Sequence, residues 1–343
     1  MEYIFDEVLE IKNGKNQKTV ENPKGKYPIY GSGGIMGYAD NYICEADTVI
    51  IGRKGSINNP IYVSEPFWNV DTAFGLSAKR ECLLPRYLFY FCKKFNFEKL
   101  NKTVTVPSLT KSDLLKIKIE LPDISIQKKV VDRLSKIEAI IERRKQELLL
   151  LDELIKARFV EMFGSPVSNP MFWKKRTLKE VCIKLNDGTH FSPESFETGE
   201  YKYVTAKNIK VTGFDFTNIT YVPEEVHRPI YERCNPELGD VLYIKDGATT
   251  GIAMVNTLEE EFTLLSSVAL LKQNRTIMNG YFLTTLLNNE DMYMDIRNNM
   301  GGAAITRLTI AKLNAIKVIV PPMELQKQFA DFVTQVNKSK FSS

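Results

Sequence analysis

The segment Leu109–Asp132 reads LTKSDLLKIKIELPDISIQKKVVD, and the segment Leu308–Asp331 reads LTIAKLNAIKVIVPPMELQKQFAD. One alignment without gaps pairs these segments from end to end, and the matched pairs are Leu114 with Leu313, Ile117 with Ile316, Lys118 with Lys317, Pro122 with Pro321, Gln127 with Gln326 and Asp132 with Asp331. The distance between the copies is far longer than the period of a solenoid. The chain is therefore expected to contain two large copies of one structural plan.

Weaker matches extend the repeat upstream once gaps are allowed. Val49–Gly55 aligns with Val241–Gly247, Tyr27–Tyr30 aligns with Tyr201–Val204, and Asn13-Gly14 lies near Asp187-Gly188. Short runs rich in β-branched and aromatic residues, broken by Gly and Asn, predict strands. The expected strands are Tyr27–Ile29, Thr48–Ile51, Ile61–Val63, Ile117–Leu121, Tyr201–Thr205, Val241–Ile244, Ser267–Leu271 and Ile316–Val320, and the expected short helices are Tyr87–Phe95 and Tyr281–Leu287.

A long helix is predicted between the two copies, over residues 123–163. It contains no Gly or Pro before Gly164, and Asp123 or Ser125 is placed to cap its first turn. Its apolar residues alternate in steps of four and three, which is the pattern of a coiled-coil seam. At 1.5 Å per residue, this helix spans roughly 57 Å. The seam consists of Val130, Leu134, Ile137, Ile141, Leu148, Leu151, Ile155 and Met162.

A coiled-coil seam needs a partner helix, and the second copy begins one. Phe329, Val333 and Val336 match the first residues of the seam. The printed sequence stops at Ser343, well short of the length of the first helix. We therefore expect either a truncated form or a partner helix completed by another chain.

Composition excludes several classes of protein. The chain has 343 residues, of which 43% are hydrophobic and 26% charged, and its net charge is +4, as in ordinary globular proteins. The first ten residues do not form a signal peptide, no apolar run is long enough to cross a membrane, and five scattered cysteines without a CxxC pair are typical of free thiols in a reducing compartment. These features predict a cytoplasmic protein of two domains.

No catalytic motif is recognisable in the sequence. Gly52-Arg53-Lys54-Gly55-Ser56 is rich in glycine but lacks the order of a phosphate-binding loop, and Gly31–Gly34 is not a dinucleotide fingerprint. The only histidines are His190 and His227, so a histidine-rich metal site is excluded. We therefore expect no catalytic residue, no metal ligand and no cofactor in this chain.

Three stretches of the first half carry a family resemblance. They are YPIYGSGGIMGY at Tyr27–Tyr38, VIIGRKGS at Val49–Ser56 and FWNVDTAF at Phe67–Phe74. Together with the repeated Pro and Gln at the start of each long helix, and with FVEMFG at Phe159–Gly164, they resemble the DNA-specificity subunit of type I restriction-modification systems. The resemblance covers nearly the whole chain.

The resemblance implies an architecture and a function. The fold is expected to be α+β, with two pseudo-repeated target-recognition domains of mixed β-sheet and helices, separated by a long coiled-coil helix. The domains would be residues 1–122 and 164–320, with the central helix at 123–163 and the start of a distal helix at 321–343. Each domain would read one part of a split, asymmetric sequence in double-stranded DNA, and the helices would set the spacing between the parts. The partners implied are modification (methyltransferase) subunits and restriction subunits, and these would carry S-adenosylmethionine, ATP and Mg²⁺.

Direct reading of DNA needs Arg, Lys, Asn, Ser or Thr side chains on exposed loops. Six polar loops qualify, three in each half, at residues 13–18, 53–59, 102–110, 186–192, 245–250 and 297–307. The candidate DNA-binding residues on them are Lys15, Asn16, Lys18, Arg53, Lys54, Ser56, Asn58, Thr105, Ser108, Thr189, His190, Lys245, Thr249, Thr250, Arg297 and Arg307. Arg53 and Lys54 are the strongest candidates, and Lys245 is the counterpart of Arg53.

Two other functions remain open at this stage. The chain could be a truncated assembly scaffold or decoy that uses the seam without reading DNA. It could also be a fragment of a fused restriction-methyltransferase that has lost its catalytic region. The steep salt dependence of DNA binding would separate a DNA reader from a scaffold.

Overall fold

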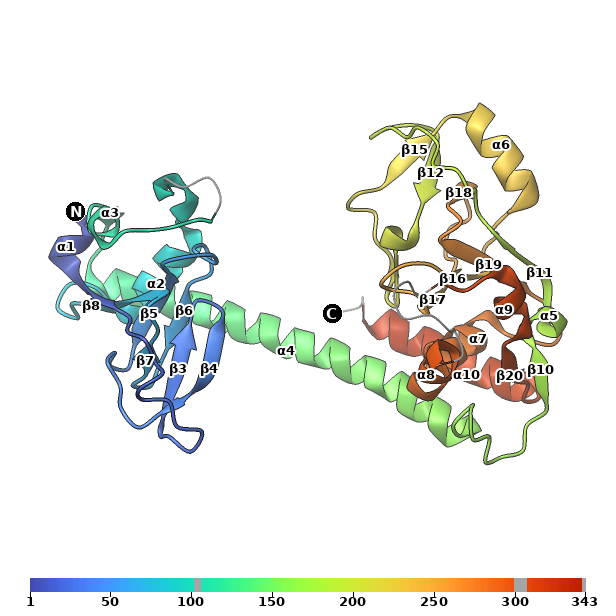
Figure 1. The fold of residues 1–343 in the computed structure, drawn as a ribbon, viewed down its shortest axis with the longest axis horizontal. Coiled ribbons are helices and arrows are strands. Elements are labelled where there is room, and N and C mark those ends of the chain that lie inside the picture. Colours follow the sequence, from blue (N-terminus) through green and yellow to red (C-terminus); the bar gives the residue numbers. More distant parts are fainter. Residues whose placement is uncertain (102–105, 299–306, 341–343) are drawn as a thin grey trace. The chain divides into compact units, whose positions relative to one another are not determined.

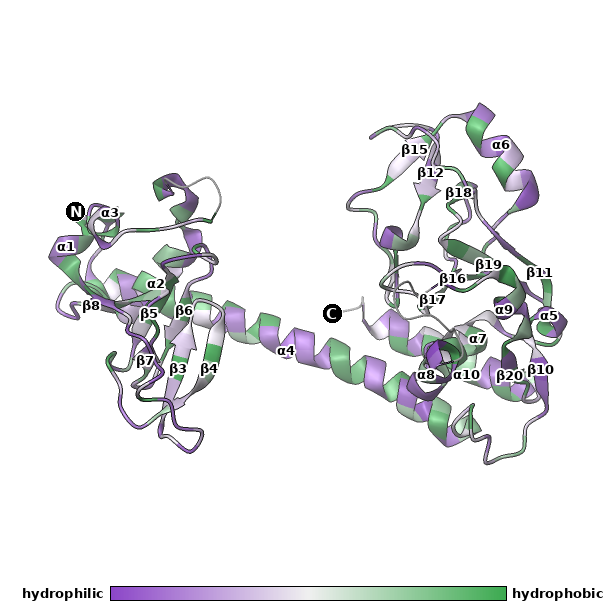
Figure 2. Cartoon of the chain, viewed as in Figure 1, coloured by the Kyte–Doolittle hydropathy of each residue, from purple (hydrophilic) through white to green (hydrophobic). Residues whose placement is uncertain are grey.

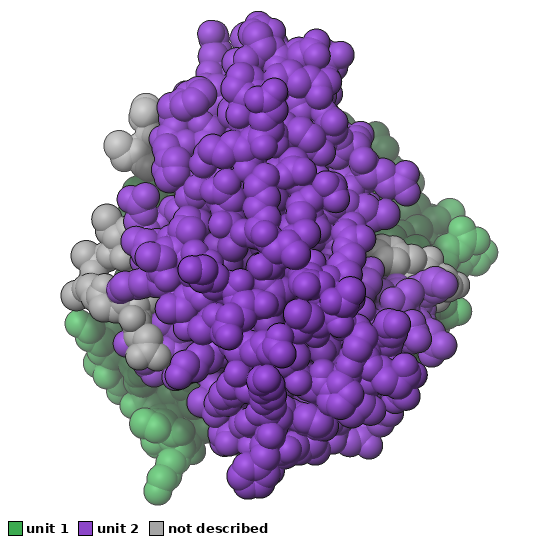
Figure 3. All heavy atoms as spheres, turned by 90° about the vertical axis from the view of Figure 1, so that its right-hand side faces the viewer, with its two compact units in different colours: residues 1–144 green, residues 145–343 purple. Residues whose placement is uncertain are grey.

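The computed structural model describes residues 1–101, 106–298 and 307–340. The chain divides into two compact units, residues 1–144 and 145–343, and each is described by itself (Figures 1 and 3). The division falls inside one long helix, α4. Among the described residues, no helix is both long enough and apolar enough to span a bilayer.

The first unit is built from two small sheets with helices packed beside them. Its elements are β1 (Glu2–Ile4), α1 (Phe5–Val8), β2 (Leu9–Asn13), β3 (Tyr27–Gly31), β4 (Gly34–Ala39), β5 (Thr48–Gly52), β6 (Ile61–Val63), β7 (Trp68–Asn69), β8 (Ala73–Ala78), α2 (Pro85–Lys94), the 3₁₀ helix η1 (Phe97–Leu100), α3 (Lys111–Leu114), β9 (Lys118–Glu120) and the first part of α4 (Ile124–Phe163). The larger sheet is antiparallel with strand order β2-β8-β5-β6, and the smaller has the order β4-β3-β7, in which β3 and β7 are parallel. The strands β1 and β9 form a separate pair.

The second unit repeats this plan. Its elements are β10 (Lys175–Thr177), α5 (Leu178–Val181), β11 (Cys182–Asp187), β12 (Tyr201–Val204), the 3₁₀ helix η2 (Ala206–Asn208), β13 (Ile209–Lys210), β14 (Gly213–Phe214), β15 (Thr220–Val222), α6 (Glu224–Arg233), β16 (Val241–Ile244), β17 (Ala253–Val255), β18 (Phe262–Leu264), β19 (Val268–Gln273), α7 (Gly280–Leu287), α8 (Glu290–Asn298), α9 (Ile310–Ala315), β20 (Lys317–Ile319) and α10 (Met323–Ser339). The sheets are β11-β19-β16-β17 and β15-β12-β18, with β12 and β18 parallel and with β10 and β20 paired separately.

The two units therefore have the same sheet topology, and the repeat predicted from the sequence is confirmed. The strand order β2-β8-β5-β6 corresponds one to one with β11-β19-β16-β17. The α+β fold class with two pseudo-repeated halves and a long central helix is likewise confirmed. The second unit has additional elements, the 3₁₀ helix η2, the short hairpin β13-β14 and the helix α6, which the sequence patterns did not predict. The strands expected before the prolines are shorter than predicted, Lys118–Glu120 and Lys317–Ile319.

The helix α4 runs for 40 residues without a break. Leu, Ile, Lys, Glu and Arg make up most of its sequence, and all of these except Ile lose little side-chain freedom in a helix. Polar and apolar segments alternate along it in Figure 2. Gly164 ends the helix: its φ of 73° lies in the left-handed region, and its backbone N–H donates to the carbonyl of Val160.

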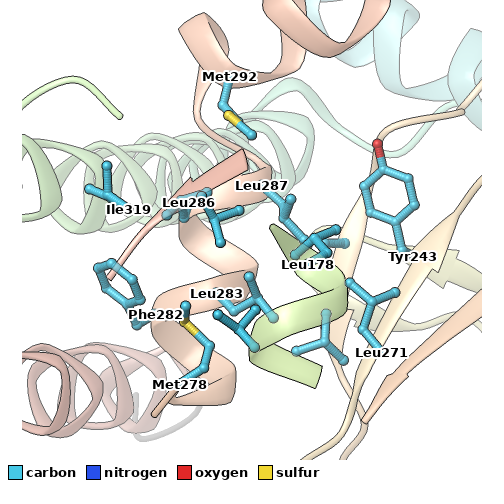
Figure 4. Packing of buried hydrophobic residues seen from close by; sticks show 14 of the residues in the cluster. Leu178, Tyr243, Leu271, Met278, Phe282, Leu283, Leu286, Leu287, Met292 and Ile319 are labelled. Atoms are coloured by element: carbon cyan, nitrogen blue, oxygen red, sulfur yellow. The ribbon is translucent and has the colours of Figure 1, made fainter. Parts of the chain in front are cut away.

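The core of the second unit joins its helices to one face of the larger sheet. Figure 4 shows Leu283 and Leu287 of α7 on the side of Tyr243 and Leu271 of the sheet, and Phe282 and Leu286 on the side of Ile319. Phe329 of α10 lies 5.6 Å from Phe159 of α4, measured between ring centroids. Further along, Lys340 pairs with Asp152 at 2.5 Å, so α10 runs antiparallel to the last part of α4.

Candidate nucleic-acid interface

Three loops of the first unit meet at one edge of its larger sheet. Because β2 and β5 both pair antiparallel with β8, their last residues lie beside the first two residues of β8, Asn13 beside Phe74 and Gly52 beside Ala73. The backbone N–H of Arg53 donates to the Thr72 carbonyl at 2.7 Å, and the carbonyl of Arg53 accepts from Leu109 at 2.9 Å. Lys15 donates from its backbone to Asn69 at 2.8 Å. The predicted loops at residues 13–18 and 53–59 and the described part of the loop at 102–110 are therefore brought together.

The same edge exists in the second unit, with equivalent hydrogen bonds. Lys245 donates from its backbone to Ser267 at 2.9 Å and accepts from Leu308 at 2.8 Å. Thr189 donates from its backbone to Leu264 at 2.8 Å, as Lys15 does to Asn69. Lys245 is thus the structural counterpart of Arg53, as the sequence alignment predicts.

Close backbone contacts fix both edges. A Cβ atom on Gly14 would lie 1.7 Å from the carbonyl oxygen of Val70, and one on Gly188 would lie 1.9 Å from that of Leu264. Only glycine allows the backbones to approach so closely. These two glycines hold the first loop of each unit against the neighbouring strand.

The candidates of the first unit are mostly exposed. Lys15, Asn16, Lys18, Arg53, Lys54, Ser56 and Asn58 are exposed, Ser108 is half-buried, and Thr105 lies outside the described residues. Asn58 has a structural partner, because its Oδ1 accepts a hydrogen bond from the backbone of Phe97 at 2.7 Å. The guanidinium of Arg53 lies 5.9 Å from the centre of the Phe74 ring.

In the second unit, only some of the candidate DNA-binding residues are exposed as expected. His190, Thr249 and Arg307 are exposed, and Arg297 is half-buried against Tyr293. The expected exposure of three others is wrong, since Thr189, Lys245 and Thr250 are buried. Lys245 is 1% exposed, with its Nζ 2.8 Å from Asp246 and 3.4 Å from Asp187.

Two differences between the units explain why Lys245 is buried and Arg53 is exposed. Asp187 occupies the place of Asn13, so a buried carboxylate holds the lysine amine inside the second unit. Ala269 occupies the place of Phe74, so the lysine has space that a phenyl ring fills in the first unit. The sequence contains both differences, but only the strand register shows that they act on this lysine.

Arg233, at the last position of α6, also reaches this edge and was missed by the sequence reasoning. Its Nη1 lies 3.6 Å from Asp187, and its Nη2 donates to the Gly188 carbonyl at 2.5 Å. Asn186 donates its side-chain amide to the backbone carbonyl of Arg233 at 2.9 Å. No sequence motif marks Arg233, because α6 has no counterpart in the first half.

The predicted seam of α4 is partly covered. Ile155 and Met162 pack on the core of the second unit. Val130, Leu134, Leu148 and Leu151 are half-buried, whereas Ile137 and Ile141 are about half exposed.

The other titratable candidates of the second unit, His227 and two cysteines, are shielded from solvent to different degrees. The buried His227 is hydrogen-bonded to Thr263 and Glu261, and burial lowers its pKa. Burial also raises the pKa of the Cys234 and Cys182 thiols to about 12, so neither is a ready nucleophile. In the part of the chain that the structure describes, no group of three or more acidic, His or Cys side chains is placed to hold a metal ion.

The chain matches the family model of the type I restriction-modification DNA specificity domain twice, at residues 2–150 and 170–342. It is 22% identical over 306 residues to the type I restriction enzyme MjaIX specificity subunit of Methanocaldococcus jannaschii, a match that covers 82% of this chain and 68% of the relative.

Two solved structures have a similar fold. The S subunit of a type I restriction-modification system from M. genitalium aligns with a TM-score of 0.65 and 18% identity, over 99% of this chain and 90% of that one. A chain from a study of complex assembly and conformational transition of the type I restriction-modification system aligns with a TM-score of 0.54 and 16% identity, over 100% and 91%. Specificity subunits are the non-catalytic subunits of type I restriction-modification systems. With both halves matched by the family model, the chain belongs to the family of type I restriction-modification DNA-specificity proteins.

Proposed function

We propose that this chain is the subunit through which a type I restriction-modification complex reads a split, asymmetric DNA sequence. The observation that carries the proposal is the equivalent sheet edge in the two units, which presents different side chains in each. The first unit exposes Arg53 and Lys54 there, and the second exposes His190 and Arg307. The two sheet edges have the same backbone geometry but carry different side chains. Such a pair favours a DNA target whose two parts have different sequences.

The proposal also assigns the partners. Modification subunits dock on the long helices α4 and α10, and they supply S-adenosylmethionine and the methyl transfer. Restriction subunits supply ATP- and Mg²⁺-dependent cleavage, and this chain itself holds no cofactor. The exposed apolar residues of α4, among them Ile137, Ile140 and Ile141, support docking because such a row is otherwise costly to leave in water.

Methylation sequencing of cellular DNA tests this function. The full chain is expressed with a type I modification subunit, and cells with the modification subunit alone are the control. We expect new adenine methylation at one split motif whose two parts differ. Two identical parts in inverted order would contradict the asymmetric target.

A second measurement separates a DNA reader from a scaffold. Co-purification of the chain with the modification subunit, without new methylation and without binding to duplex DNA, would identify a scaffold or decoy. A DNA reader binds duplex with an affinity that falls steeply as salt rises, because bound counterions are released from the phosphates.

A further inference from the structure

Two carboxylates and three cations form one connected cluster at the sheet edge of the second unit. Asp187 is buried and contacts Lys245 at 3.4 Å, Arg233 at 3.6 Å and the His190 Nε2 at 3.2 Å. Asp187 ends β11, Lys245 directly follows β16, Arg233 ends α6, and His190 lies in the loop after β11. The cluster is therefore assembled only by the fold of this unit.

The second carboxylate extends the cluster to the loop that follows α8. Asp246 contacts Lys245 at 2.8 Å and the Arg307 Nε at 3.2 Å. Asp246 and Arg307 also form an antiparallel backbone bridge, which corresponds to the bridge between Lys54 and Ser108 in the first unit. In the first unit the exposed cation of this bridge is Lys54, in the segment after β5. In the second unit it is Arg307, in the opposite segment of the bridge.

The charges of the cluster do not cancel. Lys245, Arg233 and Arg307 carry three positive charges against the two negative charges of Asp187 and Asp246, which leaves one net positive charge without counting His190. The two arginine side chains are 43% and 59% exposed, whereas that of Lys245 is 2% exposed. The net charge is therefore presented to solvent by the arginines alone.

We propose that Arg233 and Arg307 are phosphate-contacting residues of the second unit, and that the buried Lys245 is a positioning residue for them. The proposal rests on the DNA-reading function given above. Lys245 contacts both carboxylates from inside, at 2.8 Å to Asp246 and 3.4 Å to Asp187, and its charge balances one of the two. The two arginines together therefore keep one positive charge that the carboxylates do not balance. Each guanidinium has five N–H donors in a planar fork, and the donors not used on Asp187, Gly188 or Asp246 remain available to phosphate oxygens.

The contrast between the units supports this division of roles. In the first unit the equivalent positions are Asn13, Arg53 and Lys54, and both cations are exposed without a buried carboxylate beside them. In the second unit the lysine that replaces Arg53 turns inward, and the helix α6 brings Arg233 to the same edge. In the second unit, Arg233 of the added helix α6 therefore supplies the exposed positive charge that the buried Lys245 does not.

Salt-dependent DNA binding tests the two arginines. The full chain, assembled with its modification subunit, is titrated with duplex carrying the methylated motif and with unrelated duplex, at several salt concentrations. Each of R233Q and R307Q should lower the slope of log affinity against log salt by about one, because one phosphate contact contributes roughly 0.9 to that slope. Both variants should weaken binding to the two duplexes by a similar factor.

Arg275 provides the matched control. It is 60% exposed and paired with the buried Asp240, but it follows β19 at the end of the strand opposite to this sheet edge. R275Q should leave the salt slope unchanged. An equal loss in R275Q and R233Q would overturn the assignment of a specific contact.

The role of Lys245 is tested by comparing the effect of K245M on the salt slope in two backgrounds, the wild type and R233Q/R307Q. K245M should lower the salt slope in the wild-type background, because the two freed carboxylates then neutralise the arginines. It should not lower the slope further in the R233Q/R307Q background. A purely structural lysine would instead reduce the thermal stability and leave the slope of the folded protein unchanged in both backgrounds.

The outcomes distinguish this inference from the proposed function. If the wild-type assembly binds duplex without salt dependence, the DNA-reading function itself fails. If the wild type binds with a steep slope and R233Q and R307Q match it, the function stands and the assignment of the arginines is wrong.

Discussion

Gln127 and Gln326 occupy equivalent places in the two units and make the same set of hydrogen bonds. The Oε1 of Gln127 accepts from the Leu84 backbone at 2.9 Å, and its Nε2 donates to the Cys82 and Pro122 carbonyls. Gln326 accepts from Asn279 at 2.9 Å and donates to the Ile277 and Pro321 carbonyls. Each glutamine is fully buried and ties the start of a long helix to the start of a shorter one.

Replacing Gln326 by Met should destabilise the second unit by about 1–3 kcal/mol, because a buried N–H and two carbonyls lose their partner. Hydrogen exchange of the Asn279 amide should accelerate in Q326M. The control is Q328M, which alters an exposed glutamine two positions further along the same helix and should change neither quantity. Unchanged exchange at Asn279 would contradict the role of the buried side chain.

Gly188 should be intolerant of even the smallest side chain. G188A places a Cβ against the Leu264 carbonyl and must shift the loop that carries His190, at a cost of about 1–3 kcal/mol. Denaturant unfolding of the variant measures this loss. In the first unit, G33A is the control, because no atom lies within 4 Å of the Cβ it would add.

The sequence alone predicts the repeat, because the matched segments contain residues with strict roles. Gln127 and Gln326 are needed for buried hydrogen bonds, and Gly14 and Gly188 for close backbone contacts. The same reasoning fails where the halves diverge. The inward turn of Lys245 depends on the neighbours Asp187 and Ala269, which only strand pairing identifies, and α6 has no partner in the first half against which it could be aligned.

Phe329 should be the most sensitive apolar position of α10. Its ring lies 5.6 Å from Phe159 and 5.7 Å from Phe163, so F329A leaves a cavity and should cost about 3–5 kcal/mol. Trp173, whose ring centroid lies 6.5 Å from that of Phe163, reports the unfolding of this unit by its fluorescence. In contrast, F172A alters a ring that is 90% exposed and should change stability by less than about 0.5 kcal/mol.

His227 should make the second unit less stable in mild acid. Burial lowers its pKa, although Glu261 opposes the shift, and Tyr201 stacks on the ring at 3.8 Å. Because the unfolded histidine titrates near its ordinary pKa of about 6.5, the unfolded chain binds the proton more readily than the folded one. The contribution of this group is therefore fully present above about pH 6.5 and is lost as the pH falls through the lower folded pKa.

Thermal unfolding between pH 7.5 and pH 5 measures this effect, and H227Q should flatten the pH dependence because it cannot take up the proton. A pH dependence that is unchanged in H227Q, or a wild type that gains stability as the pH falls, would exclude His227 as the source.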